Sequence, residues 1–184
     1  MRSYEKVPYP EKPYKSRKNQ DIRGYEKLIK VLFVCHGNIC RSPMCEFVFK
    51  DLVKKQHLED RFEIASAATS SEEIWRGVGN PVYPPAKRKL TEHGISCEGK
   101  TAYQMTYVDY QYYDYIVAMD RENLGYLYRI SHDDRDHKIS LLMDYTDRPG
   151  DVADPWYTRD FEATWIDVDE GCRAFLQYLL KKRS

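Results

Sequence analysis

Residues 34–43 read VCHGNICRSP, and this stretch decides the fold of the chain. The short apolar run at residues 28–34 leads into it, and its closing Ser-Pro pair is typical of the N-cap and first turn of a helix. Gly37 and Asn38 tolerate positive φ, which lets successive backbone N–H groups turn inward around one tetrahedral anion. The stretch therefore predicts a strand that leads through an anion-binding loop into a helix, whose N-terminal dipole also favours negative charge.

Two side chains give this loop its predicted chemistry. Cys35 opens the loop and Arg41 closes it, so both can face one phosphate group from different sides. The inward N–H groups, the helix dipole and the guanidinium favour the thiolate, which is the nucleophilic form of cysteine. The planar fork of arginine binds two phosphate oxygens at once. We expect Cys35 to attack phosphorus, Arg41 to bind the phosphate, and Ser42 to donate a hydrogen bond to the sulfur.

The rest of the chain alternates between strand and helix patterns. Further strands are predicted at residues 62–65, 115–118 and 138–142, and further helices at residues 84–93, 121–129 and, after an N-cap at Asp160, from residue 161 onward. This alternation indicates a single-domain α/β fold, with a four-stranded parallel sheet and helices on both faces. Ligands bind at the carboxyl ends of such strands, which is where the loop lies.

The composition limits the classes of partner. Lys+Arg and Asp+Glu are equal at 29 each, so no charge imbalance indicates nucleic acid or a membrane surface. No apolar run reaches the roughly 20 residues that span a bilayer, and no apolar core of a secretory signal begins the sequence. We expect a soluble, cytoplasmic protein, and the pattern gives no indication of an oligomeric state.

The N-terminal segment differs from the rest in composition. Residues 1–23 carry seven Lys or Arg against three Asp or Glu, with prolines spaced among tyrosines and almost no aliphatic residues. Such a composition is typical of an extended or disordered tail. We expect a basic tail over residues 1–24 and one folded domain over residues 25–184.

The loop sequence CHGNICRSP resembles the signature of the low-molecular-weight protein tyrosine phosphatases. The resemblance covers roughly residues 27–180, and four further phrases follow in the family's order: SAAT at 66–69, EHGI at 92–95, DYIVAMD at 114–120 and DPWY at 154–157. It implies hydrolysis of phosphotyrosine, in a protein or in a small phosphate ester, through a phosphocysteine intermediate. It also implies that the reaction requires no metal and no cofactor.

A second loop supplies the general acid in this prediction. A tyrosine phenolate leaves poorly because its conjugate acid has a pKa of about 10, so a proton must be supplied as the P–O bond breaks. Asp154 precedes a proline, which favours an extended conformation, and the aromatic residues that follow can desolvate its carboxyl group. The resemblance supports Asp154, because the family's acid lies in an Asp-Pro-aromatic-aromatic loop.

The resemblance also implies residues that support the loop. Asn38, Ser66 and His93 would form a hydrogen-bond network that holds its shape, and Asp120 would give structural support. From the sequence alone, His93 fits better as an ordinary histidine at a helix C-terminus before its glycine, and the two interpretations can hold together.

The remaining predicted site residues lie around the loop. Trp75, Trp156 and Tyr157 are expected to wall an aromatic cleft that admits phosphotyrosine and is too deep for phosphoserine. His36 and Ile39 belong to the phosphate-binding loop, as does Cys40. Cys40 resembles the family's second loop cysteine, which can capture an oxidised nucleophile as a disulfide, and a packing thiol is the alternative.

Four other functions share parts of this pattern. Arsenate reductases need relay cysteines where this chain reads VAMDR at residues 117–121. Protein arginine phosphatases of the same family carry a threonine in place of Ile39, whose bulk favours a flat phenyl ring. Phosphocarriers lack an Asp-Pro acid loop, and a phosphopeptide-binding module would lose the nucleophile or the acid, whereas Cys35 and Asp154 are both present. An arginine phosphatase and a non-catalytic phosphopeptide-binding module remain the alternatives.

Overall fold

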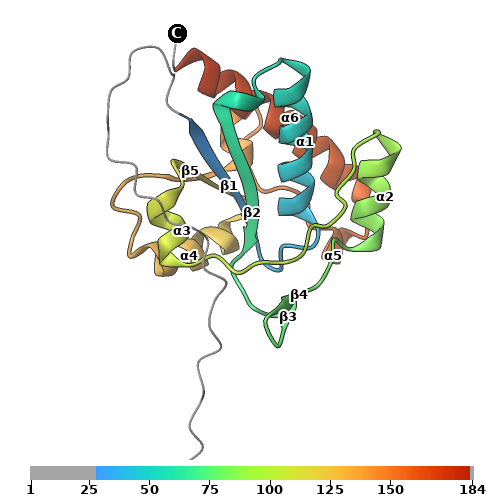
Figure 1. The fold of residues 1–184 in the computed structure, drawn as a ribbon, viewed down its shortest axis with the longest axis horizontal. Helices are drawn as coiled ribbons and strands as arrows, with labels where there is room; N and C mark the ends of the chain where they lie inside the picture. The colour runs from blue at the N-terminus through green and yellow to red at the C-terminus, as the bar shows by residue number, and fades with distance from the viewer. Residues whose placement is uncertain (1–27, 183–184) are drawn as a thin grey trace, which may run out of the picture.

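Four parallel strands form the central sheet of the computed structural model, which describes residues 28–182 (Figure 1). In chain order they are β1 (Ile29–Cys35), β2 (Phe62–Ala68), β5 (Tyr115–Ala118) and β6 (Ile139–Leu141), and in space the order is β2-β1-β5-β6. β1 therefore lies inside the sheet, paired with β2 and β5. The predicted parallel sheet is confirmed, while the expected tail at residues 1–24 lies outside the described residues.

Helices connect the strands and cover both faces of the sheet. They are α1 (Arg41–Lys55), α2 (Pro84–Glu92), α3 (Tyr107–Tyr112), α4 (Arg121–Ser131), α5 (Pro155–Thr158) and α6 (Phe161–Lys181). Short elements complete the described chain: the 3-10 turns η1 (Glu59–Arg61) and η2 (Leu142–Tyr145), and a hairpin of β3 (Ile74–Trp75) and β4 (Val78–Gly79). Figure 1 shows α1 beside α6, with α3 and α4 across the sheet from them.

The period-two alternation along β1 explains why both faces are covered. Val31, Phe33 and Cys35 belong to a buried cluster with residues of α1 and α6. Leu32 and Val34 belong to a second cluster, with residues of α3 and α4. A strand that is buried on both faces needs a nearly continuous apolar run, which residues 28–34 supply with Lys30 as the one exception.

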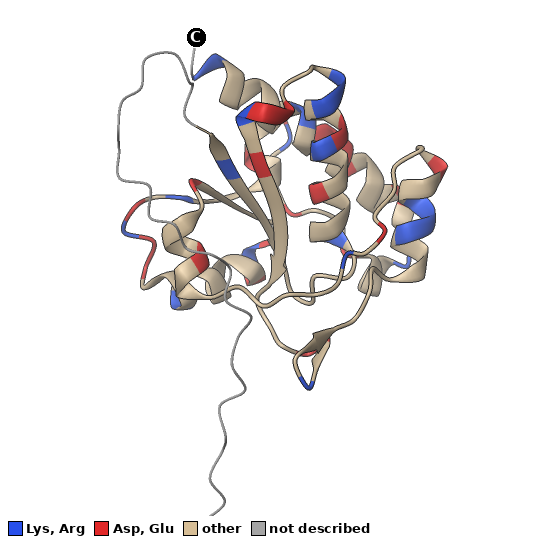
Figure 2. Cartoon of the chain, in the orientation of Figure 1, with Lys and Arg blue, Asp and Glu red and all other residues tan. Residues whose placement is uncertain are grey.

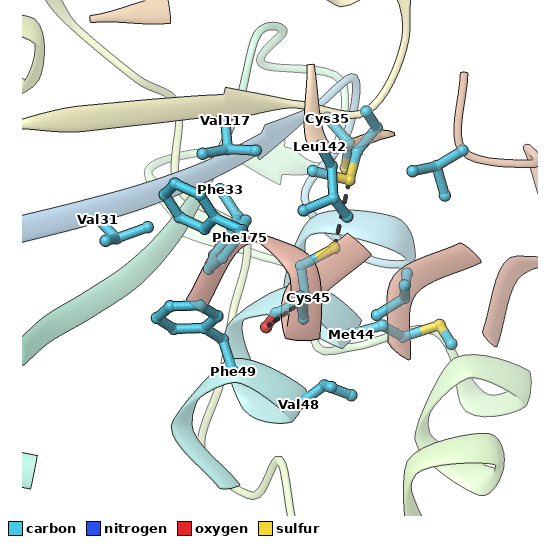
Figure 3. Packing of buried hydrophobic residues seen from close by; sticks show 14 of the residues in the cluster. Val31, Phe33, Cys35, Met44, Cys45, Val48, Phe49, Val117, Leu142 and Phe175 are labelled. Carbon is cyan, nitrogen blue, oxygen red and sulfur yellow. Dashed lines mark hydrogen bonds between the residues drawn. The ribbon is translucent and has the colours of Figure 1, made fainter. Parts of the chain in front are cut away.

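The cluster under α1 and α6 is built around three aromatic rings (Figure 3). The ring of Phe33 meets those of Phe49 and Phe175 edge to face, with centroids 5.4 and 6.3 Å apart. Cys35 belongs to the same buried cluster, two residues further along β1. The loop that follows β1 therefore starts from closely packed core rather than from a mobile surface segment.

Helix α1 begins earlier than the sequence predicts. The expected N-cap was Ser42, but the helix starts at Arg41 and its N-cap residue is Cys40, whose side chain makes no capping hydrogen bond. The hydroxyl of Ser42 is instead engaged by Cys35 and Asn38. Pro43 still lies within the first turn, where its missing N–H removes no helical hydrogen bond.

Two other helices contrast in how well the sequence predicts them. Asp160 caps α6 as expected, because its carboxylate accepts from the N–H groups of Glu162 and Ala163. Helix α3 was not predicted, although its start carries a capping box between Thr106 and Asp109. The dense run of tyrosines around it has no clear helical apolar stripe, so its periodicity gave no signal.

Charged residues are distributed over the whole described surface. Figure 2 shows basic and acidic residues interspersed along the helices and loops. The longest helix, α6, carries charged residues between Glu162 and Arg173 and again at Lys181. No helix within residues 28–182 is long and apolar enough to cross a membrane.

Candidate active site

Cys35 is the last residue of β1, and its side chain is buried. The chain then turns through residues 36–40 directly into α1, so the sulfur lies near the N-terminus of that helix. The hydroxyl of Ser42 is 3.0 Å from the Cys35 sulfur. A hydroxyl at this distance can donate to a negatively charged sulfur and stabilise it.

Asn38 holds the shape of the loop. It takes a left-handed conformation with φ of 57°, whereas Gly37 keeps a negative φ, so only one of the two expected residues uses this freedom. Its side-chain carbonyl accepts from the backbone N–H of Tyr103 at 3.1 Å, and its amide nitrogen donates to Ser42 at 2.9 Å and to Ser66 at 2.8 Å. These bonds hold a backbone conformation that is unfavourable for a residue with a side chain.

The network behind the loop continues to a buried ion pair. Ser66, on β2, donates its hydroxyl hydrogen to the Glu46 carboxylate at 2.6 Å. Lys100 lies 3.3 Å from the same carboxylate oxygen and donates to the backbone carbonyl of Ser66 at 2.9 Å. Burial lowers the pKa of the Lys100 ammonium, and the neighbouring Glu46 opposes that effect. Neither Glu46 nor Lys100 was predicted, because no local motif marks them.

The structure does not bring His93 into this network, which corrects the role that the resemblance implied. His93 is the C-cap of α2, and its ring stacks on that of Trp165 in α6, with centroids 3.7 Å apart. The alternative interpretation, a histidine at a helix C-terminus, describes where it lies. Lys100 is the basic side chain that contacts Ser66.

Arg41 is the first residue of α1, and its guanidinium is held by two carboxylates. One terminal nitrogen binds Asp120 at 2.5 Å, and the other binds Asp154 at 2.6 Å. Burial disfavours the charge of Arg41, but Cys35, Asp154 and Asp120 outweigh this effect and raise its pKa. Arg41 is therefore a fixed cation beside the sulfur.

The two carboxylates that hold Arg41 come from different elements. Asp120 follows β5 and caps α4, where it accepts from the N–H of Asn123, so the helix fixes its position. Asp154 has the extended conformation expected before a proline and caps the short helix α5 by accepting from the N–H of Trp156. The structure thus brings Cys35 and Arg41, from the two ends of one loop, together with Asp154 from a distant part of the chain.

The expected wall residues are strongly exposed. Trp156 packs on the ring of Tyr83, with centroids 5.2 Å apart, and is 59 % exposed, while Tyr157 is 84 % exposed. Trp75 lies on the β3–β4 hairpin and is 75 % exposed. Trp75 was expected to wall the cleft, yet the side chains of this region that contact the loop belong to two acidic residues just before the hairpin.

Those two residues, Glu72 and Glu73, were missed from the sequence. The carboxylate of Glu72 lies 3.0 Å from the ring nitrogen Nε2 of His36. The side chain of Glu73 covers Gly37 so closely that a Cβ atom there would lie 3.0 Å from its Cγ, and Asn80 holds its carboxylate. A consecutive Glu pair is an ordinary surface feature in a sequence, so it gave no signal.

Cys40 is a free, buried thiol next to the site, and Ile39 beside it is also buried. Burial, together with the negative charges of Cys35 and Asp154, raises the pKa of Cys40 to about 12. Cys40 is therefore a thiol rather than a thiolate at neutral pH. Within residues 28–182, no group of three or more His, Cys, Asp and Glu side chains is placed to hold a metal ion.

Comparison with known proteins places these residues in context. A model of the family described as "Low molecular weight phosphotyrosine protein phosphatase" matches residues 30–184. The "Low molecular weight protein-tyrosine-phosphatase YfkJ" of Bacillus subtilis is 39 % identical over 158 residues, which are 85 % of this chain and 99 % of that protein. The human "Low molecular weight phosphotyrosine protein phosphatase" is 40 % identical over 152 residues, covering 80 % of this chain and 93 % of the human one.

Solved structures show the same fold. The crystal structure of Bacillus subtilis YfkJ superposes with a TM-score of 0.82 at 37 % identity, covering 88 % of this chain and all of the other. A Drosophila arginine phosphatase, DARP, superposes with a TM-score of 0.73 at 33 % identity, covering 82 % of this chain and 98 % of the other. The fold is therefore shared by proteins whose names give two different phosphorylated side chains.

Proposed function

Because the chain belongs to the low molecular weight phosphotyrosine protein phosphatase family, we propose that it hydrolyses phosphotyrosine through a phosphocysteine intermediate on Cys35. One observation carries this proposal: Cys35, Arg41 and Asp154 converge on a single loop, with Arg41 bonded to Asp154. A nucleophile, a fixed cation and a carboxylate around one anion-binding loop are the parts that phosphoryl transfer needs.

In the first step, the Cys35 thiolate attacks phosphorus and the bond from phosphorus to the tyrosine oxygen breaks. Arg41 and the loop N–H groups bind the phosphate oxygens. The phosphate replaces Asp154 on the guanidinium, and the released carboxylate takes up a proton from water and then gives it to the departing phenolate. The products of this step are tyrosine and the phosphocysteine.

In the second step, Asp154 takes a proton from water, and the oxygen of that water attacks phosphorus. The P–S bond breaks, inorganic phosphate forms, and the electron pair returns to the sulfur of Cys35. Ser42, at 3.0 Å from the sulfur, stabilises the thiolate as it leaves. No group outside the protein, the ester and water enters either step.

Phosphoarginine is the second candidate substrate. Glu72 and Glu73 bring negative charge next to the loop, which would favour a cationic side chain on the phosphate. Ile39 favours the phenyl ring, because an apolar side chain beside the phosphate packs more favourably on an aromatic ring than on a polar guanidinium. We therefore propose phosphotyrosine as the main substrate class.

The test is steady-state hydrolysis of phosphotyrosine, phosphoserine and phosphoarginine peptides by the wild-type and Cys35→Ser proteins, in EDTA with reductant. We expect turnover of phosphotyrosine alone, and a fall of at least about 10³-fold in the variant, which keeps binding the ester. Preference for phosphoarginine would keep the mechanism and change the substrate. Wild-type rates in the variant would exclude Cys35 as the nucleophile.

A further inference from the structure

The hydrogen-bond chain behind the loop has a fixed direction. The backbone N–H of Tyr103 can only donate, so the oxygen of the Asn38 side chain must face it and the amide nitrogen must face the two hydroxyls. That nitrogen donates to both Ser42 and Ser66. Each hydroxyl therefore accepts from Asn38 and keeps its own hydrogen to donate onward.

The two branches of this chain end on two anions. Ser66 donates to the carboxylate of Glu46, and Ser42 has the Cys35 sulfur at 3.0 Å, closer than its other acceptor, the carbonyl of Ala67 at 3.3 Å. The direction of the chain suits a charged carboxylate at one end and a thiolate at the other. A protonated Glu46 would leave the hydrogen of Ser66 without its charged acceptor.

Glu46 is buried, so its charge needs a partner. Its two oxygens have different ones. Lys50 binds Oε1 from the same helix and is 42 % exposed, whereas Lys100 lies on Oε2, the oxygen that accepts from Ser66, and is 13 % exposed. A buried carboxylate is stabilised far more by a buried counter-charge than by an exposed counter-charge. Lys100 is therefore the more important partner of Glu46.

Lys100 also belongs to the segment that orients Asn38. It lies three residues before Tyr103, whose N–H fixes the amide, and its own ammonium is tied to the carbonyl of Ser66 on β2. Residues 100–103 therefore contact the network at two points: Tyr103 binds Asn38, and Lys100 binds Ser66 and Glu46.

We propose that Lys100 is a positioning residue for Cys35. By balancing the charge of Glu46 and binding the carbonyl of Ser66, Lys100 holds Ser66 as an acceptor of the Asn38 amide. The same amide donates to Ser42, whose hydrogen bond to the Cys35 sulfur therefore depends on Lys100. The consequence for turnover rests on the proposed function, but the effect on the sulfur does not. Loss of Lys100 weakens the donation from Ser42 and makes the thiolate less favourable.

Different charged groups surround Lys100 and the phosphate-binding side of the loop. Lys100 interacts with Glu46 and Lys50 from α1 and with Cys35 from β1. The charged or titratable groups on the phosphate-binding side are Cys40, Arg41, Glu73 and Asp154. Substitution of Lys100 leaves all of the latter in place, so a change at the sulfur reports the network and not the phosphate-binding side.

The first measurement is the rate at which iodoacetamide alkylates Cys35, identified by peptide mass, as a function of pH in the full-length protein. We expect Lys100→Met to move the midpoint of this profile upward by about one pH unit, the size expected for loss of one hydrogen bond to a charged sulfur. Lys100→Arg, which keeps the charge, should restore most of the shift. The matched control is Lys50→Met, which removes the exposed partner of Glu46 and should leave the midpoint unchanged.

Ser42→Ala tests whether Lys100 acts on the sulfur through the hydrogen bond from Ser42. This variant should raise the midpoint by a similar amount, and Lys100→Met added to it should produce no further shift, because both act on one hydrogen bond. Additive shifts would show that Lys100 acts on the sulfur directly. An unchanged midpoint in a folded Lys100→Met protein would overturn the proposal.

Turnover provides a second readout. We expect kcat to fall about tenfold in Lys100→Met while KM changes less than about threefold, since Arg41 and the loop N–H groups still bind phosphate. If Lys100→Met does not fold, Glu46→Gln carries the test, because it removes the carboxylate that Lys100 balances with little change in volume. Ser66 then loses its charged acceptor, so the midpoint should shift in the same direction, whereas a direct effect of the lost negative charge on the sulfur would lower it. Alkylation needs no substrate, so absence of phosphatase activity would count against the proposed function and not against Lys100.

Discussion

The rear and the rim of the phosphate loop are built in opposite ways. The rear consists of the buried residues Asn38, Ser42, Ser66 and Glu46 and the largely buried Lys100, joined by hydrogen bonds from one end to the other. The rim consists of Glu72, Glu73, Trp75, Trp156 and Tyr157, whose large aromatic side chains are all more than half exposed. A buried polar group without a partner is costly, so the rear tolerates little change, whereas the rim can vary without loss of the fold.

The rear and the rim have different roles in catalysis. The rear fixes the positions of Cys35 and Ser42 and so governs the chemical steps. The rim meets whatever surrounds the phosphate on the substrate and so governs selectivity. Substitutions at the rear should therefore lower kcat and stability together, and substitutions at the rim should change KM and leave stability almost unaffected.

The largest loss of activity is expected at Asp154, which lies beside the rim residue Trp156 and binds Arg41. Asp154→Ala should lower turnover of phenyl phosphate by about 10²- to 10³-fold, because no acid protonates the phenolate, and should hardly affect aryl esters with much better leaving groups. Kinetics on a series of aryl phosphates measures this. Asp151→Ala, at an exposed Asp earlier in the same segment, is the control. Equal losses for all leaving groups would remove Asp154 from the acid's role.

A substitution at the rear should come next in size. Asn38→Ala removes the amide that joins Tyr103, Ser42 and Ser66, so kcat should fall by roughly 10- to 100-fold and the protein should lose about 1–3 kcal/mol of unfolding free energy. Denaturant unfolding and steady-state kinetics measure the two effects. Asn80→Ala is the matched control, because that asparagine bonds the exposed Glu73. Similar losses in both variants would mean that the rear has no special role.

The same contrast explains how far the sequence could predict the site. Cys35, Asn38, Arg41 and Ser42 lie within one short stretch, where strand, loop and helix signals overlap, so local rules were enough. Asp154 was predicted as the acid because the family's acid lies in an Asp-Pro-aromatic-aromatic loop; alone, an Asp-Pro pair usually indicates only a turn. The loop residues and Asp154 also match a family signature. That resemblance, and not local chemistry, indicated that the two loops act together.

The rest depends on contacts between distant parts of the chain. His93 was assigned to the network from the family resemblance, but α2 packs its C-terminal end on α6, and the His93 ring stacks on Trp165. Lys100 lies in a connecting segment with no pattern of its own, and its role follows only from the position of β2 beside α1. Rim residues such as Glu73 depend on how a hairpin lies over the loop.

At the rim, Trp156 should matter more than Trp75. Trp156 adjoins Asp154 and packs on Tyr83, so Trp156→Ala should raise KM for phosphotyrosine peptides about three- to tenfold, with kcat nearly unchanged. Trp75→Ala, on the exposed hairpin, should change KM less than about twofold. Both proteins should unfold within about 0.5 kcal/mol of the wild type. Equal effects on KM would extend the cleft wall to the hairpin.

The smallest change in activity is expected for Cys40→Ser. This variant tests whether a buried polar group beside the loop can lie outside the catalytic machinery. The pKa of Cys40 is raised to about 12, so the thiol keeps its proton through neutral and mildly alkaline pH and adds no charge to the site. Cys40→Ser should therefore keep kcat/KM within about twofold of the wild type from pH 6 to 9 in the presence of reductant, with the same profile shape. Iodoacetamide at these pH values should label Cys35 and leave Cys40 unmodified. A limb of the wild-type profile that disappears in Cys40→Ser would show that this thiol ionises with the site, and Cys40 would then join the rear as a functional group rather than a neighbour.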